Sequence, residues 1–498
     1  MRELDRLIRN VKGISIACAI FLFFILSHGI VMAGEDPANA GPPDPNGRAE
    51  PGREGGSSWF SRLGGGGRLA NLLAVEADWQ VESAALVPFY GSRIDTIVVT
   101  GNTRTKPGTI LREMATKQGR PFEEKLIRRD TQFLRGLGYF SEVHVSAEET
   151  GGGACRLVLA ITERPGLFMR YPYPVVNYDF TQGISYGLTW RIKNFRGLGD
   201  DISLTALNRP HRDRGVGFSF RDPWFMGKRI QLRVDLLGYQ RREIPEFDDF
   251  IKEQTLGCVT LGVPLTPSLV HQLWFRPSVT FERRNSRLTR SIPGVGITKD
   301  FHFQDFVSVG AELEYDSRSN RISPFDGMLH RFRVMRFSSV SGIDSKYVFY
   351  SSTDMFYLPV GTNKSFILSF NGNVREGDLP TFFEMGLAGT RDLRGFTKDD
   401  LRGTARIITT IQYRHQFLGP VVLPIPKIGK FDITLNGTVF VDNGALASSV
   451  LDFPQSTFFT TGGVGIEIIS PLRDLMRIEL ATDGSGSPAF YLTAGSNY

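Results

Sequence analysis

Two short stretches of this chain contain charged or nucleophilic side chains in recognisable patterns. In "LRGF", Arg394 precedes Gly395 and Phe396 in a loop-like segment, and Asp442 lies further along in "FVDNGA". An arginine and a carboxylate screened from water can form a bidentate pair that orients a loop. In "GISYG", Ser185 has the Gly-x-Ser-x-Gly spacing of a hydrolase nucleophile. The arginine and the acid would hold a structure together, whereas the serine would form a covalent intermediate.

The serine is the weaker candidate, because its surroundings do not fit a nucleophile elbow. Such an elbow needs a strand, a sharp turn and then a helix. After Ser185, "LTWRIKN" instead continues the alternation of a strand. The seven histidines are scattered and lack metal-ligand spacing. We therefore predict that the protein is not an enzyme and uses neither a cofactor nor a metal.

Length and composition indicate a large β-structure with many turns. The chain has 498 residues, which is enough for two or three domains, and it contains 54 glycines and 38 phenylalanines. The net charge is only +6, and the absence of a dense basic run argues against a nucleic-acid partner. Cys155 and Cys258 lack metal-ligand spacing, so they either pair in an oxidising compartment or remain as packed thiols.

The N-terminus has the pattern of a targeting segment. A basic head precedes a mostly apolar run over residues 14–26, and Val31 and Ala33 occupy the small-residue cleavage positions. We predict a signal peptide over residues 1–33, with an uncleaved anchor helix as the alternative. Residues 34–91 are rich in Gly and Pro, and they are predicted to form a flexible linker because they cannot bury enough apolar surface to offset their chain entropy.

Residues 92–165 have the pattern of a small α/β domain. A strand-like "IDTIVVTGN" precedes two segments with helical apolar spacing, and two alternating segments follow. This order predicts a sheet covered on one face by helices, with one edge left open. The strand "SEVHVSAE" contains Val143 and Val145, and we predict that extended client or partner segments pair along it. A plain spacer domain is the alternative.

Residues 166–498 repeat short segments in which apolar and polar residues alternate. In "KFDITLNGTVFVD", Ile433, Leu435 and Val439 share one face. We count about sixteen such segments, which suits a transmembrane β-barrel. Alternation alone would also fit a soluble sandwich, but the targeting segment, the large even strand count and the lack of covering helices favour the barrel. We predict an outer-membrane barrel of about 16 antiparallel strands, preceded by the α/β domain in the periplasm.

Several motifs resemble one known family in content and in order. "VTGNTRT", "LRGLGYFSEVHV" and "ITERP" resemble the polypeptide-transport-associated (POTRA) domain. "NFRGLGD", "FRDPWFMGKR", "YDSRSNRISPFDG", "LRGF" and "FVDNGA" resemble motifs of BamA/TamA-like assembly factors, the bacterial surface antigen family. The terminal "FYLTAGSNY" resembles the insertion signal of such barrels, carried by Phe490, Leu492, Gly495 and Tyr498. The chain differs in having a single POTRA-like module.

The resemblance implies a role for Arg394. In the family this arginine lies on an external loop that folds into the barrel lumen and pairs with acids there. Period-two counting independently puts Asp442 on the polar, lumen face of its segment. Gly395 would let the loop turn tightly, and Phe396 would pack against the inner wall. Gln412 stands where relatives tend to carry glutamate, so we expect a clamp that depends mainly on Asp442. A solvated surface turn is the alternative.

The resemblance also implies a function. It predicts an outer-membrane factor that inserts β-barrel proteins, or helps proteins cross the membrane, through a weakened seam near residues 175–181 and 490–498. Its partners would be unfolded outer-membrane or secreted clients, membrane lipid, and accessory periplasmic or lipoprotein subunits. The alternatives are a two-partner-type translocator for one dedicated substrate and a passive pore.

Overall fold

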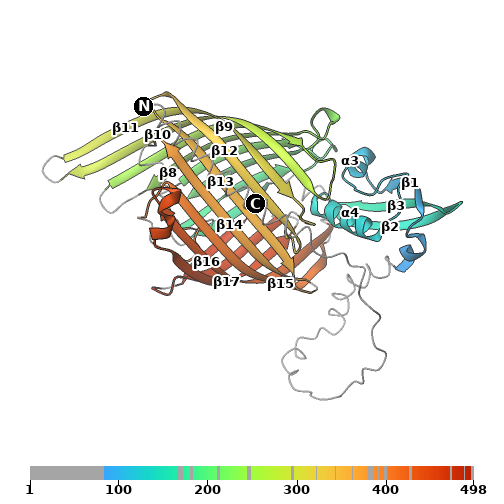
Figure 1. The fold of residues 1–498 in the computed structure, drawn as a ribbon. Coiled ribbons are helices and arrows are strands. Elements are labelled where there is room, and N and C mark those ends of the chain that lie inside the picture. The colour runs from blue at the N-terminus through green and yellow to red at the C-terminus, as the bar shows by residue number, and fades with distance from the viewer. Residues whose placement is uncertain are drawn as a thin grey trace, which may run out of the picture. The chain divides into compact units, whose positions relative to one another are not determined.

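The computed structural model describes a small α/β domain and a closed β-barrel (Figure 1). The expected signal peptide, most of the expected linker, Gly495 and Tyr498 lie outside the described residues. The description covers residues 84–494 apart from 165–171, 180–182, 210–212, 244–247, 293–295, 321, 343, 362, 380–384, 390–391, 397–400, 426–428, 471–473 and 487.

The small domain packs two helices on one face of a three-stranded sheet. The strand order is β1-β3-β2, with β1 parallel and β2 antiparallel to β3. This is the element order predicted from the sequence. Its elements are η2 (Val87–Phe89), β1 (Arg93–Thr100), α3 (Pro107–Arg112), α4 (Glu124–Gly136), β2 (Phe140–Gly151) and β3 (Ala154–Glu163). None of the helices described is long and apolar enough to cross a membrane.

The core of this domain lies between its helices and the sheet. On α4, Ile127 and Leu134 share the helix face that points into the core, and both are fully buried. Leu86 joins the same cluster and is 1% exposed, although we expected residues 34–91 to be linker. The packed region therefore begins before residue 92. Cys155 is buried in this core and Cys258 lies on a barrel strand; both are free thiols, so they do not pair.

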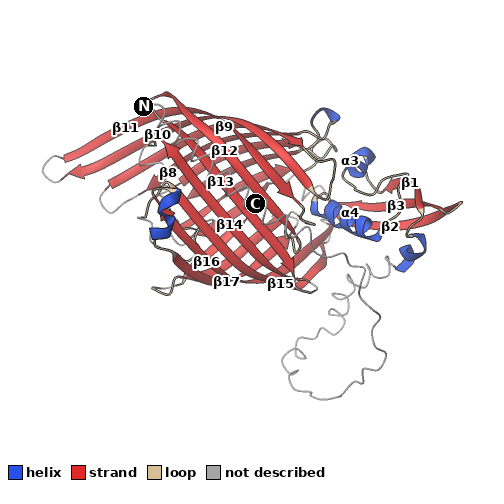
Figure 2. Cartoon of the chain, viewed as in Figure 1, coloured by secondary structure: helices blue, strands red, loops and turns tan. Residues whose placement is uncertain are grey.

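Sixteen antiparallel strands, β4 to β19, close into a barrel in sequence order, which confirms the predicted fold class (Figure 2). Two short 3-10 helices, η3 (Phe225–Gly227) and η5 (Val450–Gln455), lie in its connections. The strands are β4 (Pro172–Asp179), β5 (Gly183–Ile192), β6 (Asp201–Arg209), β7 (Asp213–Asp222), β8 (Gln231–Glu243), β9 (Asp248–Pro264), β10 (Gln272–Ile292), β11 (Gly296–Asp316), β12 (Gly327–Ser341), β13 (Lys346–Pro359), β14 (Lys364–Gly377), β15 (Ala405–Ile425), β16 (Gly429–Ala447), β17 (Phe459–Ser470), β18 (Asp474–Thr482) and β19 (Ala489–Ala494).

Along each strand, side chains alternate between the outer surface and the lumen. On β11, Val309 is 59% exposed, whereas Glu312 and Glu314 are each 6% exposed. On β15, Ile411 is 58% exposed and Gln412 only 8%. Apolar side chains therefore form the outer belt that lipid requires, and the charged side chains face an interior in which they pair with one another.

Strand length and the number of registered residue pairs differ greatly around the barrel. We call β10 and β11 the far wall, and β4 and β19 the seam. The two far-wall strands have 21 residues each and are registered along their full length. The seam strands have only 8 and 6 residues, and among their described residues one registered pair, Leu492 with Tyr178, joins them.

Candidate functional site

The loop between β14 and β15 folds back against the lumen face of the C-terminal strands. Leu387, Leu393 and Phe396 form a small apolar cluster within it, each at most 1% exposed. The backbone N–H of Leu393 donates to the carbonyl of Leu387 at 2.8 Å, so the chain doubles back just before Arg394. The ring of Phe396 packs 4.6 Å from that of Phe459 on β17. Apolar burial therefore fixes the loop tip that carries the arginine.

Arg394 meets two carboxylates, an arrangement we call the loop clamp. Its Nε and Nη2 donate to the two carboxylate oxygens of Asp442 at 2.7 Å each, and its Nη1 donates to Oε1 of Glu479, also at 2.7 Å. The guanidinium carbon lies 3.4 Å from the ring centre of Phe440. The hydroxyl of Thr410 donates to Asp442 at 2.8 Å. Since the Arg394 side chain is only 11% exposed, these charge-assisted bonds are shielded from water and strongly directional.

Glu479 is the member of the loop clamp that the sequence reasoning missed. Gln412 does lie on the lumen face, in the wall of a cavity of about 210 Å³. Among the described residues, however, Arg394 bonds only to Asp442 and Glu479. Asp442 accepts two of these three hydrogen bonds, and β18 supplies a second acid that the expectation did not include. The signal was present in "RIELAT", where Arg477 and Glu479 alternate with apolar residues and so share the lumen face.

Gly395 brings the loop tip against the backbone of β18. Its φ is +85°, in the left-handed region that favours glycine. A Cβ at this position would lie 2.6 Å from the amide nitrogen of Thr482 and 2.7 Å from the carbonyl carbon of Ala481. The Gly395 N–H donates to the hydroxyl oxygen of Tyr491 at 2.9 Å. The loop is thus bonded directly to β19, the last strand of the barrel.

The described part of the predicted insertion signal lies at the seam. Phe490 is 37% exposed on β19, and its ring lies 5.6 Å from that of Tyr178 on β4. Leu492 is the residue registered with Tyr178. Gly495 and Tyr498 fall outside the described residues. The aromatic contact and the single registered pair therefore hold the same small patch of the seam.

A second group of charges is buried further along the lumen wall. Arg414 on β15 is fully buried and pairs with Glu467 on β17 at 2.8 Å, and Arg477 on β18 reaches the same carboxylate at 3.3 Å. Arg414 also donates to the carbonyl of Pro324 at 2.8 Å. Pro324 belongs to "YDSRSNRISPFDG", the turn between β11 and β12, which therefore contacts the lumen wall. Because antiparallel strands alternate, this turn belongs to the barrel end opposite the β14–β15 loop.

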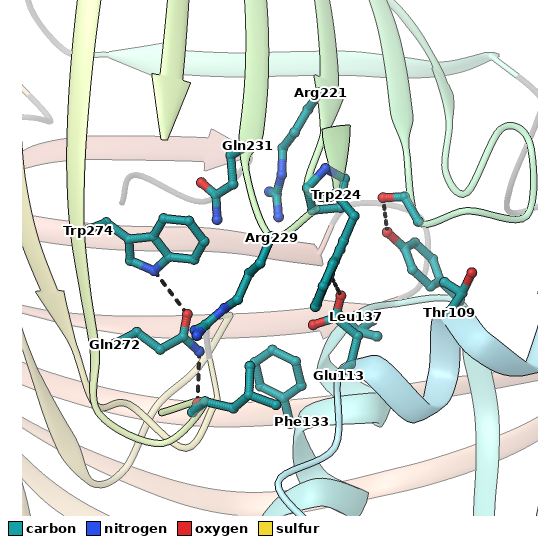
Figure 3. A pocket seen from close by; sticks show the side chains of 14 residues that line it. Thr109, Glu113, Phe133, Leu137, Arg221, Trp224, Arg229, Gln231, Gln272 and Trp274 are labelled. Atoms are coloured by element: carbon teal, nitrogen blue, oxygen red, sulfur yellow. Dashed lines mark hydrogen bonds between the residues drawn. The ribbon is translucent and has the colours of Figure 1, made fainter. Parts of the chain in front are cut away.

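The small domain contacts barrel turns at the end where β4 begins. Tyr139 donates to the carbonyl of Gly199 in the β5–β6 turn at 3.0 Å. Nε1 of Trp224, in the β7–β8 turn, donates to Glu113 at 2.6 Å (Figure 3). Burial raises the pKa of the Tyr139 hydroxyl well above its usual range. The gap in this contact measures about 40 Å³, room for roughly one water. The contact therefore serves docking and leaves no space for a small-molecule ligand.

Glu163 orders one of the loops used in this docking. Its carboxylate accepts hydrogen bonds from the N–H of Thr105 at 2.6 Å, the N–H of Arg104 at 3.0 Å and the hydroxyl of Thr103 at 2.8 Å. Burial raises the pKa of Glu163, but these hydrogen bonds outweigh it and leave the pKa below its usual range. Asn194 of the β5–β6 turn donates to the Thr105 hydroxyl at 2.7 Å. Glu163 thereby connects the end of β3 to the barrel.

The strand β2 is an edge of the small sheet. Its ladder partner is β3, and the described part of the chain places no strand on its other side. Val143 and Val145 are 0% and 4% exposed, so their side chains belong to the core, whereas His144 and Ser146 are exposed. A pairing segment would therefore contact the backbone of β2 and not the two valine side chains.

Ser185 is part of the barrel wall. It lies within β5, 5% exposed and registered with Asn177 of β4. The strand runs straight through the position at which a nucleophile elbow would turn into a helix. The Gly-x-Ser-x-Gly spacing at this position therefore reflects strand residues.

A closed sixteen-stranded barrel with an inward loop clamp, following a three-stranded α/β domain, defines a class of outer-membrane barrel with a periplasmic domain. Two family models match the chain: "Omp85 superfamily domain" over residues 194–498 and the POTRA model "Surface antigen variable number repeat" over residues 92–164. The chain belongs to the Omp85 superfamily. This confirms the resemblance to BamA/TamA-like factors with one POTRA domain. The barrel lies in the outer membrane, with the POTRA domain on the periplasmic side.

Curated relatives resemble the chain over part of their length. Outer envelope protein 80, chloroplastic, of Oryza sativa subsp. japonica is 21% identical over 437 residues, which cover 79% of this chain and 60% of that protein. Outer membrane protein assembly factor BamA of Neisseria meningitidis serogroup B is 25% identical over 178 residues, which cover 35% of this chain and 22% of that protein. The chain thus spans 60% or less of these relatives.

Two solved structures share the fold. CdiB from Acinetobacter baumannii aligns with a TM-score of 0.53 and 14% identity, covering 80% of this chain and 73% of that one. CdiB from Escherichia coli aligns with a TM-score of 0.52 and 13% identity, covering 82% of this chain and 75% of that one. At such low identities the likeness concerns the architecture alone.

Proposed function

We propose that this protein inserts β-barrel proteins into the outer membrane, with β4 and β19 parting to receive client strands. The observation that carries the proposal is the single registered pair that the described residues supply at the seam, against the 21-residue ladder at the far wall. One pair supplies at most two backbone hydrogen bonds, so opening it leaves few backbone groups without partners. Opening the 21-residue ladder would leave many more, and in lipid each such group costs several kcal/mol.

Parted seam strands would act as templates. Each would present a row of unpaired N–H and C=O groups, and in lipid every such group costs several kcal/mol unless it is bonded. A client strand has the same unmet requirement. Pairing of the client with β4 or β19 satisfies both strands at once, so a client would enter the membrane as hydrogen-bonded strands. The exposed apolar belt of the barrel holds the seam at the depth of the lipid.

The POTRA domain supplies a first contact for clients in this proposal. The open backbone edge of β2 suits an extended segment by strand addition. Docking of the domain on the β5–β6 and β7–β8 turns would keep that edge close to the seam strands. We propose unfolded outer-membrane or secreted proteins as clients, the outer-membrane lipid as a partner, and accessory periplasmic or lipoprotein subunits as further partners.

A disulfide across the seam tests the proposal. In a Cys258→Ser background, Tyr178→Cys and Leu492→Cys place two thiols on registered residues, which are about 4.5–5.5 Å apart between Cα atoms in antiparallel strands and can form a disulfide. The purified full chain in liposomes is given a urea-unfolded barrel client, and protease-protected client is measured. We expect the oxidised variant to lose insertion and to regain it on reduction.

A matched control locks the far wall instead. Val279 and Val309 are registered on β10 and β11, and both face outward. The oxidised Val279→Cys/Val309→Cys variant should insert clients as well as the reduced form. Equal activity of the seam-locked and seam-free forms would contradict insertion through the seam. In cells, depletion of the protein should lower the abundance of other outer-membrane barrels, and an unchanged outer-membrane proteome would count against an insertase.

Translocation of a dedicated secreted protein is the second candidate. It is favoured by the shared architecture with CdiB at TM-scores of 0.53 and 0.52. In that case the client passes through the lumen, so the loop clamp must move while the seam stays closed. The seam-locked variant would then remain active. A passive pore has less support, because the loop tip and the β11–β12 turn both occupy the lumen side of the wall.

A further inference from the structure

We propose that the tip of the β14–β15 loop is a latch on the seam, in which Glu479 and Tyr491 are positioning residues that transmit the state of the loop to β18 and β19. The proposal deepens the proposed function, since it names what controls opening of the seam. We call Arg394, Gly395, Glu479 and Tyr491 the seam latch. Its parts come from the loop and from the last two strands of the barrel.

The first observation is the direction in which Arg394 reaches. Two of its donors bind Asp442 on β16, and the third binds Glu479 on β18, next to the last strand. Gln412 on β15 lines the same cavity, and among the described contacts it receives no hydrogen bond from Arg394. Glu479, the second carboxylate of the loop clamp, therefore lies on the strand next to β19, which closes the barrel.

The second observation is that the loop holds the last strand itself. Gly395 donates its N–H to the hydroxyl oxygen of Tyr491 on β19 at 2.9 Å. The Tyr491 side chain is fully buried and packs with Phe440, Ala481 and Ala489, which come from β16, β18 and β19. The ring of Tyr491 is therefore held between residues of β16, β18 and β19. Its hydroxyl marks the point at which the loop tip rests on β19.

The third observation is how little else holds β19. It has 6 residues, which pair with β18 from Ala489 to Ala494 on one side. On the other side, the described residues supply the single pair between Leu492 and Tyr178. The hydrogen bond from Gly395 therefore adds to a strand whose described ladder with β18 is only six residues long. When the loop leaves the lumen wall, β18 and β19 lose a buried ionic partner and a hydrogen bond together.

Hydrogen exchange of the β19 amides measures the latch directly, without any client. The intact chain is compared with Glu479→Gln, which removes a charge, and Tyr491→Phe, which removes only a hydroxyl. We expect amides of residues 489–494 to exchange about tenfold faster in each variant, a factor that corresponds to 1.4 kcal/mol of opening free energy. Amides of the far wall should exchange at the wild-type rate. Retained heat-modifiable migration on gels verifies that the barrel has folded.

A variant that moves the carboxylate to another strand distinguishes a latch at the seam from an effect of the total charge in the cavity. Gln412→Glu combined with Glu479→Gln returns a second carboxylate to the cavity wall, but on β15 and away from the seam. We expect the loop tip to regain protection while β19 stays fast. Wild-type exchange of β19 in the single variants would overturn the proposal, and so would full rescue of β19 by relocation. Failure of the insertion assay would leave these exchange rates unaffected, so the two proposals fail separately.

Discussion

The seam and the far wall close the same barrel by different means. At the far wall, β10 and β11 bond backbone to backbone over 21 residues, and lumen-facing charges such as Arg276, Glu312 and Glu314 pair across the strands. At the seam the described residues supply a single registered pair, and a distant loop contacts the last two strands, through Arg394 with Glu479 on β18 and through the backbone N–H of Gly395 with Tyr491 on β19. A ladder opens only by breaking many bonds in sequence. A side-chain latch opens when one loop moves, so closure of the seam can be regulated.

Among the substitutions that test this contrast, Arg394→Ala should have the largest effect. The substitution leaves Asp442 and Glu479 buried without their cation, and breaking a buried pair costs about 3–5 kcal/mol. We expect a matching loss of stability in heat- or denaturant-induced unfolding of the purified barrel, together with loss of client assembly.

Asp442→Ala should impair assembly as well, and Arg394→Ala/Asp442→Ala should be no worse than the worse single variant. Additive losses would show that the two side chains act separately. A structure of Arg394→Ala in which the loop tip keeps its place would contradict the assignment of the arginine as the anchor.

A second prediction concerns the outer edge of β2, the edge strand of the POTRA sheet. Successive N–H groups on a strand point to opposite sides, so Val145→Pro and Ser146→Pro remove one inward and one outward donor. The variant that loses its bond to β3 should destabilise the POTRA domain by about 1–3 kcal/mol. The other should keep the fold and lose client binding, measured by cross-linking to an unfolded barrel. Normal binding by both folded variants would exclude pairing at this edge.

A third prediction probes the far wall. In Arg276→Ala, Glu314 keeps Arg331 at 2.8 Å, and Glu312 keeps its hydrogen bonds from Arg333. We therefore expect a loss of only about 1 kcal/mol, since neither acid is left alone. Denaturant unfolding measures the loss, and exchange of the β19 amides should not change. Faster exchange at β19 would show that the two regions are coupled, contrary to the contrast drawn above.

The smallest predicted effect depends on pH and concerns Glu163. Its folded pKa is depressed, so the stabilisation that it provides is present above the unfolded pKa of about 4.3 and is lost as pH falls through the folded value. In Glu163→Gln, protection of the amides of Arg104 and Thr105 should be lower than in the wild type at pH 7. The difference should vanish at acidic pH. A difference that is independent of pH would mean that the carboxylate charge does not order this loop.

The alternation of apolar and polar residues predicted most of the fold and one of the two acids of the loop clamp. Alternation put Asp442 on the lumen face, because side chains on a strand change sides at every residue. Glu479 has the same signal, but its pairing with Arg394 bridges 85 residues and depends on how strands are registered around the barrel. Tyr491 stands between Phe490 and Leu492, two residues of the predicted insertion signal, and side chains on a strand alternate between its two faces. Their shared neighbour faces inward for the same reason.

Other features could not have been read from composition. The Gly/Pro-rich surroundings of residues 84–91 suggested a linker throughout, whereas Leu86 is buried in the domain core. Burial of one leucine depends on a surface made by distant strands and helices. The sparse pairing among the described seam residues also has no signal within one strand, because it depends on the register between β4 and β19, which lie at opposite ends of the barrel sequence.

The contacts of the loop clamp also form at a particular stage of folding. Arg394 is synthesised 48 residues before Asp442 and 85 before Glu479, and Gly395 is synthesised 96 residues before Tyr491. Contacts between residues so far apart in sequence form late in folding, because the intervening chain must first be ordered. The loop tip therefore finds all of its partners only after the final strand has left the ribosome and joined β18. A buried Arg394 therefore marks a barrel in which β16 and β18 have already been placed side by side with the loop.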